Sequence, residues 1–323
     1  MPAPALQAVG LRKSYPGASR TEPVQALDDL SFEAYRGSVL GMLGPNGAGK
    51  STTVKILATL SRADGGTAVV EGIDVARDPG AVRRRIGLVS QRPSSDPMAT
   101  GRENLVLAGR LHGLNRVDAG DRATRLLARF DLSAAADRLV RTWSGGMSRK
   151  LDVAIGLVNR PALLFLDEPT TGLDPEARAD LWAEIARLTR EDETTVLLTT
   201  HYLDEADRLA DVVAIVDRGR VRVEGSPDAL KAELRGDTIT IGLATAPDPA
   251  GAVARVGSVT GVFDVSLDDG TLRARAEAGA RAVPLILAAL DESGAEVSSA
   301  TVARPTLDDV YLRHVGRSFE AVA

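Results

Sequence analysis

The sequence predicts an α/β fold, with a mostly parallel sheet at its core, an antiparallel flank, a helical insert and a small C-terminal α+β domain. A short apolar strand at 38–43 runs into a Gly-rich turn and a helix at 52–60, the order of elements around a phosphate loop. Short apolar runs at 163–166 and 196–199 indicate buried parallel strands. Beyond residue 237 the pattern becomes strand, helix, two strands, helix and strand, which indicates a second unit.

The composition is that of a globular protein with room for one large and one smaller domain. Of the 323 residues, 44% are hydrophobic and 26% are charged, which is ordinary for a folded protein. The chain contains no cysteine, so disulfides and thiolate chemistry are excluded. Its only histidines are His112, His201 and His314, too few for a His-rich metal site. The net charge of −5 argues against sequence-independent nucleic-acid binding.

No segment of the sequence is suited to enter a membrane. The first residues, MPAPA, are neither basic nor strongly apolar, unlike a signal peptide. No apolar run approaches the roughly 20 residues that span a bilayer. We therefore expect a cytoplasmic location, and a role in transport requires another polypeptide to form the membrane path.

The first 235 residues predict further elements around the parallel core. Residues 5–15 and 24–35 alternate apolar and polar positions around a turn-rich stretch, as antiparallel strands do. Residues 102–139 predict helices that are interrupted near Gly113 and Gly120. Residues 212–216 and 221–223 predict a hairpin. We expect one domain over 5–235, with a helical insert at about 92–145.

A separate small domain is predicted over 237–317. Asp269-Gly270 is a hairpin turn signal between two of its strands. The predicted elements are strands at 238–243, 262–267, 272–276 and 296–302 and helices at 249–256, 282–290 and 306–315. Their order predicts a ferredoxin-like accessory domain. It contains no recognisable catalytic constellation.

The clearest chemical motif is Gly44-Pro45-Asn46-Gly47-Ala48-Gly49-Lys50-Ser51. Its glycines allow successive backbone N–H groups to point at phosphate oxygens, and the following helix adds its positive end. Lys50 would reach the β- and γ-phosphates, and the Ser51 hydroxyl would bind Mg²⁺. A Gly-rich turn with an incidental lysine is the alternative, but the flanking strand and helix argue against it.

An acidic pair follows the buried strand at 163–166. Asp167 is expected to hold Mg²⁺ through water, and Glu168 to polarise the attacking water as general base. Alone, such a pair is more often a helix cap or a turn. Its distance from the phosphate loop and the following Pro169-Thr170 favour the catalytic interpretation.

A second phosphate contact is predicted at Ser144-Gly145-Gly146. These residues precede a helical stretch at 149–158, so a hydroxyl and unhindered amides lie at a helix N-terminus. Ser-Gly-Gly alone is usually only a loop. Its meaning depends on the motifs around it.

The combination of motifs resembles the ATP-binding cassette of ABC transporters, a P-loop NTPase fold, over roughly residues 5–230. The matches are Walker A at Gly44–Thr52, the glutamine loop at Gln91, the signature at Ser144–Gly146, Walker B at Leu163–Glu168, the D-loop at 171–174, the switch histidine at His201 and the adenine-stacking aromatic at Tyr15. Alone, Tyr15 would be an edge-strand aromatic and His201 a turn residue. The fixed order of motifs makes the resemblance specific.

The resemblance assigns roles to these positions. Catalysis is expected of Glu168, His201 and Gln91, and Mg²⁺ binding of Ser51, Gln91 and Asp167. ATP is expected to contact Tyr15, Gly44, Pro45, Asn46, Gly47, Ala48, Gly49, Lys50, Ser51, Thr52, Ser144, Gly145, Gly146 and Asp174. The signature departs from the commonest form, with Trp143 and Met147 in place of leucine and glutamine. These departures bear on the subfamily and not on hydrolysis.

Within the family, the chain resembles ATPases of the daunorubicin- and doxorubicin-resistance type, which export drugs. The matching segments are QRPSSDPMATGRENL at 91–105, WSGGMSRKLD at 143–152 and PTLDDVYL at 305–312. The resemblance implies a separate membrane permease and two ATPase copies that enclose two ATP molecules. It places the chain at the cytoplasmic face of the membrane, with the helical insert against the permease.

Three other functions compete with drug export. A soluble ABC ATPase of DNA repair or translation would be indicated by two cassettes, long coiled-coil insertions or basic patches, which the sequence lacks. A P-loop kinase or GTPase gives no reason for Ser144-Gly145-Gly146 or His201. An ABC ATPase that serves export of a lipid, polysaccharide or ion stays open, because the permease largely selects the substrate.

Overall fold

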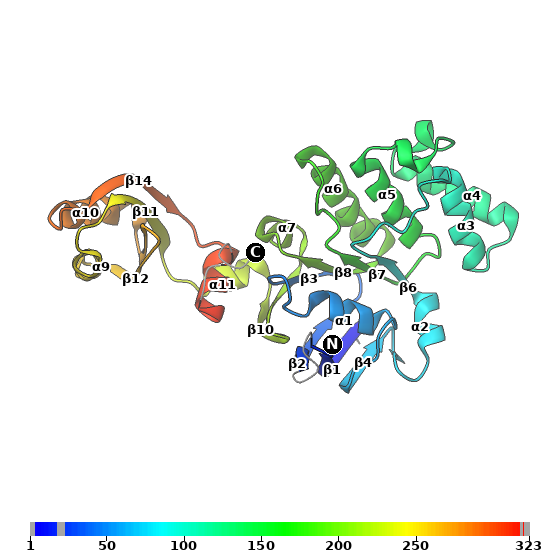
Figure 1. Ribbon diagram of the computed structural model, residues 1–323, viewed down its shortest axis with the longest axis horizontal. Coiled ribbons are helices and arrows are strands. Elements are labelled where there is room, and N and C mark those ends of the chain that lie inside the picture. Colours follow the sequence, from blue (N-terminus) through cyan, green and yellow to red (C-terminus); the bar gives the residue numbers. More distant parts are fainter. Residues whose placement is uncertain (1–3, 18–22, 317–318, 320–323) are drawn as a thin grey trace. The chain divides into compact units, whose positions relative to one another are not determined.

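The computed structural model describes residues 4–17, 23–316 and 319 (Figure 1). It contains two compact units. The first comprises the described residues up to Pro227 together with Phe319, and the second runs from Asp228 to Gly316. Among the described residues, no helix is both long and apolar enough to cross a membrane.

A six-stranded sheet forms the centre of the first unit. Its strands lie in the order β10 (Arg220–Gly225), β9 (Val212–Asp217), β3 (Val39–Leu43), β8 (Thr195–Thr200), β7 (Leu163–Asp167) and β6 (Ile86–Val89). All neighbouring pairs are parallel except β9–β10, which is antiparallel. The α/β core predicted from the apolar runs is confirmed.

Both faces of this sheet are covered, which explains why β7 is apolar from Leu163 to Leu166. Leu163 and Phe165 belong to the core shared with α1 (Lys50–Leu57), whereas Leu164 and Leu166 belong to the core shared with the helices above the sheet. Those helices are α5 (Gly145–Gly156) and α6 (Pro175–Asp192) (Figure 1). Successive strand residues point to opposite faces, so a strand buried on both sides has no polar positions.

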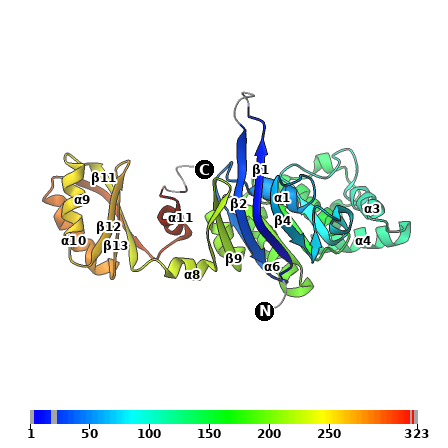
Figure 2. The same cartoon turned by 90° about the horizontal axis from the view of Figure 1, so that it is seen from below.

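An antiparallel sheet packs on the other side of α1 (Figure 2). Its strands lie in the order β2 (Val24–Ala34), β1 (Leu6–Tyr15), β4 (Gly65–Val70) and β5 (Ile73–Asp74). The pairing of β1 with β2 confirms the predicted antiparallel flank. The three arginines at 83–85 predict a solvated helix face, and they end α2 (Pro79–Arg85) with exposed side chains. The sequence patterns missed β4, β5, β6 and the short helices α7 (Leu203–Leu209) and α8 (Pro227–Ala232).

The helical insert consists of α3 (Gly101–Leu111), α4 (Arg116–Arg129), two short turns, η1 (Ser133–Ala135) and η2 (Val140–Thr142), and α5. Gly113 has a positive φ of 89° after the end of α3, as predicted for an interruption. The predicted break at Gly120 is wrong, because α4 continues through it. The buried stripe of α4, which includes Ala123 and Leu126, outweighs the roughly 1 kcal/mol that a glycine costs inside a helix.

The second unit contains a four-stranded antiparallel sheet with α9 (Pro249–Gly257) and α10 (Gly279–Asp291) against one face. The strand order is β12 (Val262–Asp268), β13 (Thr271–Ala276), β11 (Asp237–Thr245) and β14 (Glu296–Ala303). Asp269 and Gly270 join β12 to β13 with φ values of 42° and 72°, which suits a type I′ turn. The elements follow the predicted strand-helix-strand-strand-helix-strand order and end in α11 (Leu307–Val315).

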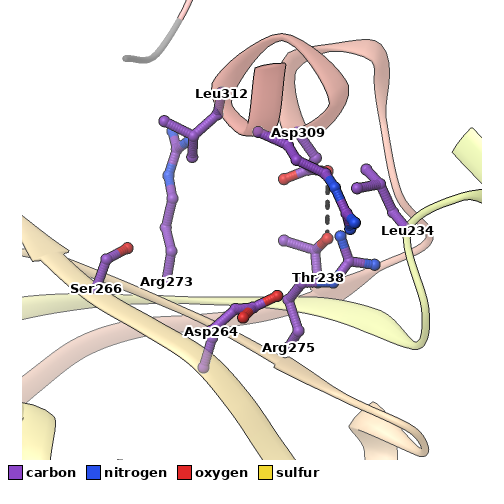
Figure 3. A pocket seen from close by; sticks show the side chains of 10 residues that line it. Leu234, Thr238, Asp264, Ser266, Arg273, Arg275, Asp309 and Leu312 are labelled. Atoms are coloured by element: carbon purple, nitrogen blue, oxygen red, sulfur yellow. Dashed lines mark hydrogen bonds between the residues drawn. The ribbon is translucent and has the colours of Figure 1, made fainter. Parts of the chain in front are cut away.

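A cavity of about 390 Å³ lies between α11 and the uncovered face of this sheet (Figure 3). Polar contacts bridge it: the Thr238 hydroxyl donates to Asp309 at 3.2 Å, and Arg273 lies 3.2 Å from Asp308. The Arg275 guanidinium donates to the carbonyl oxygens of residues 235 and 236. Because these partners lie within the unit, the polar side chains join α11 to the sheet.

Candidate nucleotide-binding site

The phosphate loop connects β3 to α1 and requires glycine at two positions. A Cβ on Gly44 would lie 2.3 Å from the carbonyl oxygen of Val216. Gly49 has a φ of 109°, and a Cβ there would lie 2.6 Å from the carbonyl oxygen of Ala26. Both contacts are closer than non-bonded atoms allow, and the left-handed φ adds strain for any other residue. The neighbouring backbone therefore fixes the curl of the loop.

Lys50 begins α1 and directs its ammonium into the loop. Its Nζ donates to the carbonyl oxygens of Gly44 at 2.6 Å and Pro45 at 3.1 Å, and it lies 3.5 Å from Oε1 of Glu168. The side chain is only 4% exposed. Burial lowers the pKa of Lys50, while the carboxylates of Glu168 and Asp167 act in the opposite direction. A buried cation that is only partly compensated favours an anionic ligand.

Asp167 ends β7 and lies next to the hydroxyl of Ser51. Its Oδ1 accepts hydrogen bonds from Ser51 Oγ at 3.1 Å and from Thr199 Oγ1 at 2.6 Å. A carboxylate and a hydroxyl are hard oxygen donors of the kind that Mg²⁺ prefers alongside nucleotide phosphates. Among the described residues, no group of three or more acidic, histidine or cysteine side chains could hold a metal by itself. The Asp167 carboxylate and the Ser51 hydroxyl fit a Mg²⁺ ion whose other ligands are phosphate oxygens and water.

Glu168 follows directly and is held in a strained conformation. Its φ is 49°, which is uncommon for a residue with a side chain. Its backbone N–H donates to both the carbonyl oxygen and the hydroxyl of Thr199, each at 3.1 Å. Its Oε2 lies 3.3 Å from His201 Nδ1, without the geometry of a hydrogen bond. In this conformation the carboxylate lies near both Lys50 and His201.

Part of the predicted site lies in one cleft of about 360 Å³. The residues from Pro45 to Thr52 line it together with Gln91 and Glu168. Two further site residues contact the lining of this cleft: Asp167 accepts a hydrogen bond from Ser51, and His201 lies next to Glu168. Tyr15 does not line the cleft, but it pairs with Val24, which does. The Lys13 ammonium lies 5.4 Å from the centroid of the Tyr15 ring.

The signature residues and Asp174 do not line this cleft. Ser144 caps α5 by accepting a hydrogen bond from the N–H of Met147 at 3.2 Å. Asp174 caps α6 in the same way, through the N–H of Ala177 at 2.8 Å. Gly145 lines a second cleft of about 350 Å³, which also contacts Gln91 and Glu168. Ser144 and Asp174 thus each have a local structural role as the N-cap of a helix.

Three polar residues of this region were not singled out from the sequence. The Thr199 hydroxyl donates to the Asp167 carboxylate and accepts from the backbone N–H of Glu168, and the guanidinium of Arg149 binds the carbonyl oxygens that follow β6 and β7. Glu205 is fully buried in α7, where its Oε1 accepts a hydrogen bond from Trp182 Nε1 at 3.0 Å. Only the unusual placement of a carboxylate on an apolar helix face could have marked Glu205.

Burial raises the pKa of Glu205, and the hydrogen bond from Trp182 and the nearby hydroxyls of Thr200 and Thr170 only partly oppose this. The folded chain then binds this proton more tightly than the unfolded chain. This tighter binding of the proton stabilises the folded chain fully below pH 4.5, the ordinary pKa of a glutamate side chain. The stabilisation is lost as the pH rises through the higher pKa of Glu205 in the folded state.

Glu205→Gln should remove that loss, because the amide retains the acceptor for Trp182 without a charge. We expect the free energy of unfolding near pH 7 to exceed that of the unmodified protein and to fall less steeply above pH 4.5. Urea unfolding across this pH range measures both. The exposed Glu191→Gln is the control, and parallel pH profiles for the unmodified protein and Glu205→Gln would contradict the assignment.

Two family models match this chain. Residues 27–171 match the family model described as ABC transporter. Residues 225–315 match the model described as ATP-binding protein DrrA1-3-like, C-terminal domain. The two matches fall largely on the two units described above.

Relatives and solved structures give the same result. The daunorubicin resistance ATP-binding protein DrrA3 of Streptomyces coeruleorubidus is 48% identical over 90% of this chain and 92% of its own. The daunorubicin/doxorubicin resistance ATP-binding protein DrrA of Streptomyces peucetius is 46% identical over 98% of this chain and 93% of its own. A dimeric ATP-binding cassette solved in a post-hydrolysis state with ADP and Pi is 25% identical, with a TM-score of 0.63 over 68% of this chain and 98% of that chain.

Proposed function

This chain belongs to the ATP-binding proteins of ABC transporters, in the daunorubicin- and doxorubicin-resistance group, and we propose that it powers drug or antibiotic export through a separate permease. It is an ATPase of the transport-coupled type. The observation that carries the proposal is the cleft in which Lys50 and Glu168 face one another at 3.5 Å beside the phosphate loop.

Hydrolysis at this cleft needs positive charge for the phosphates and a base for the water. The loop amides and Lys50 bind the phosphate oxygens and offset their negative charge. Ser51 and Asp167 would hold Mg²⁺, which neutralises developing phosphate charge when bound. Glu168 removes a proton from the attacking water. His201 lies on the far side of Glu168 from the loop lysine, and Gln91 lines the same cleft, so both can orient that water.

ATP completes the site by joining two copies of the chain. In this proposal the signature of one copy contacts the γ-phosphate held by Lys50 of the other. The N-cap positions of Ser144 and Asp174, outside the phosphate-loop cleft, support it, as does the dimeric relative. ADP lacks the bridging phosphate, so ATP favours the closed dimer and hydrolysis releases it.

The partner in the membrane is a separate permease, which would place this chain at the cytoplasmic face. The helical insert at about 92–145 is the proposed contact, because Gln91 at its start lines the nucleotide cleft. The names of the relatives favour a drug such as daunorubicin or doxorubicin as the exported substrate. Export of a lipid, polysaccharide or ion is the alternative, and purification of the permease with its bound substrate decides between them.

Substitutions at Ser144 test the shared site without loss of the helix cap. Asp and Asn cap a helix about as well as Ser, but Asp places a negative charge where the partner's γ-phosphate would lie. In a Glu168→Gln background we expect Ser144→Asp to abolish the ATP-dependent dimer and Ser144→Asn to retain much of it. Size-exclusion chromatography with and without MgATP measures this. Equal dimer content in both variants would argue against a phosphate contact at Ser144.

A further inference from the structure

Arg149 is a buried charge to which none of the roles described above belongs. It lies in α5, five residues after Ser144, and its side chain is 9% exposed. Its Nη1 lies 3.8 Å from Oδ2 of Asp152, so the two side chains form an ion pair but are too far apart for a hydrogen bond. A guanidinium placed this deeply requires hydrogen-bond partners for its donors.

Its partners are four main-chain carbonyl groups. Nε donates to Pro169 O at 2.7 Å, Nη1 to Ser90 O at 2.7 Å, and Nη2 to the oxygens of Asp167 and Glu168, both at 3.3 Å. Three of these residues are the catalytic Glu168 and its two neighbours along the chain. The fourth, Ser90, immediately precedes Gln91.

These carbonyl groups lie where the ladder between β6 and β7 stops. The last paired residues are Val89 and Leu166, so no further pairing between these two strands fixes the segments that carry Gln91 and Glu168. The planar guanidinium can bind several acceptors in one fixed arrangement. Asp152 adds a second anchor, because its Oδ1 accepts from the backbone N–H groups of Ser94 and Ser95 at 2.9 and 3.1 Å.

We propose that Arg149 is a positioning residue for hydrolysis, which holds the backbone of the Gln91 loop and of the Glu168 turn at a fixed separation. In this proposal it acts through its contacts with the backbone of both loops. Arg149, Gln91 and Glu168 line one cleft, so displacement of either loop would misalign the water that the two side chains orient. The inference rests on the proposed function, because it assigns Arg149 to the geometry of that same site.

Arg149→Lys tests the proposal, because a single ammonium retains the charge but cannot reproduce the fork of donors. We expect kcat for ATP to fall roughly 100-fold, as for a displacement of about 1 Å at a reacting centre. The Kd for ATP, measured with Glu168→Gln present to stop turnover, should change less than about threefold, because the loss concerns the transition state.

Arg122→Lys is the matched control. Arg122 also donates to main-chain carbonyl oxygens, those of Leu157 at 2.6 Å and Val158 at 3.2 Å, but beyond the opposite end of α5. It should lower thermal stability without a comparable loss of kcat. A kcat for Arg149→Lys equal to that of the unmodified protein, or a loss no larger than in Arg122→Lys, would overturn the proposal.

Asp152→Asn keeps the inference testable if Arg149→Lys does not fold. Its amide oxygen can still accept from Ser94 and Ser95, while the charge beside Arg149 is removed. We expect a smaller loss of kcat, about 10-fold, with ATP affinity retained. An unchanged kcat in a folded Asp152→Asn protein overturns the proposal in that case. Failure of the proposed function is distinguishable, since the unmodified protein would then not hydrolyse ATP.

Discussion

Glu168→Gln is expected to lower ATP turnover by roughly 10²–10⁴-fold, the typical contribution of a general base. The amide has almost the same shape as the carboxylate but cannot accept the proton of the attacking water. The backbone N–H bonds to Thr199 are unaffected, so the strained turn at φ 49° should persist. ATP should still bind through Lys50, Ser51 and Asp167.

The same variant should accumulate as an ATP-bound dimer, because the bridging phosphate is no longer removed. Chromatography in MgATP and a phosphate-release assay measure the two effects on one preparation. The exposed Glu191→Gln serves as the control and should behave as the unmodified protein. Turnover above one tenth of the unmodified rate in Glu168→Gln would contradict the role of Glu168 as base. An inactive protein that remains monomeric would count only against dimerisation without the permease.

Lys50→Ala should abolish ATPase activity and weaken ATP binding. The substitution removes charge-assisted hydrogen bonds worth roughly 1.5–3 kcal/mol, or about 10- to 100-fold in affinity. It also leaves the Glu168 carboxylate, 3.5 Å away, facing the phosphates without a compensating cation. With ATP poorly held, this variant should stay monomeric where Glu168→Gln dimerises.

Lys55→Ala is the control for the loss of a lysine from α1. Lys55 lies on the exposed face of the same helix, so its removal should leave ATP binding and turnover unchanged. Nucleotide titration followed by fluorescence gives both affinities. Unchanged turnover in Lys50→Ala would refute the assignment of the phosphate loop.

The chemistry of the phosphate loop could be predicted from the sequence because it depends on local features. Gly44 and Gly49 are required by backbone atoms within a few ångströms, and the buried strand before Asp167 is apolar on both faces. These features appear as short, uninterrupted patterns in the chain. The parallel sheet, the antiparallel flank and the order of elements in the second unit were predicted for the same reason.

Contacts between distant segments could not be predicted in this way. Arg149 binds carbonyl oxygens 18 to 20 residues ahead and 59 residues behind, and main-chain acceptors leave no trace in the sequence. The break assigned to Gly120 was wrong because the stripe of apolar residues along α4 dominates a local preference. Short elements such as β6 and α7 were missed because a few residues carry too little periodicity.

Each ATP site is proposed to be built from two chains. Mixing two variants that are each inactive, and measuring whether activity returns, is the most direct test of this proposal. In a mixed dimer of Glu168→Gln and Ser144→Asp, one site contains Glu168 of one chain and Ser144 of the other, both unmodified. The second site contains both substitutions. The proteins are mixed without nucleotide, MgATP is added, and phosphate release is measured.

If each site is built from two chains, neither variant should hydrolyse ATP alone. The mixture should recover up to about a quarter of the unmodified rate, because half of randomly paired dimers carry one intact site of two. The control replaces the Ser144→Asp chain by one that carries both substitutions, so that no intact site can form and no activity should return. A mixture as inactive as this control, with both proteins folded and able to bind ATP, would contradict the shared site.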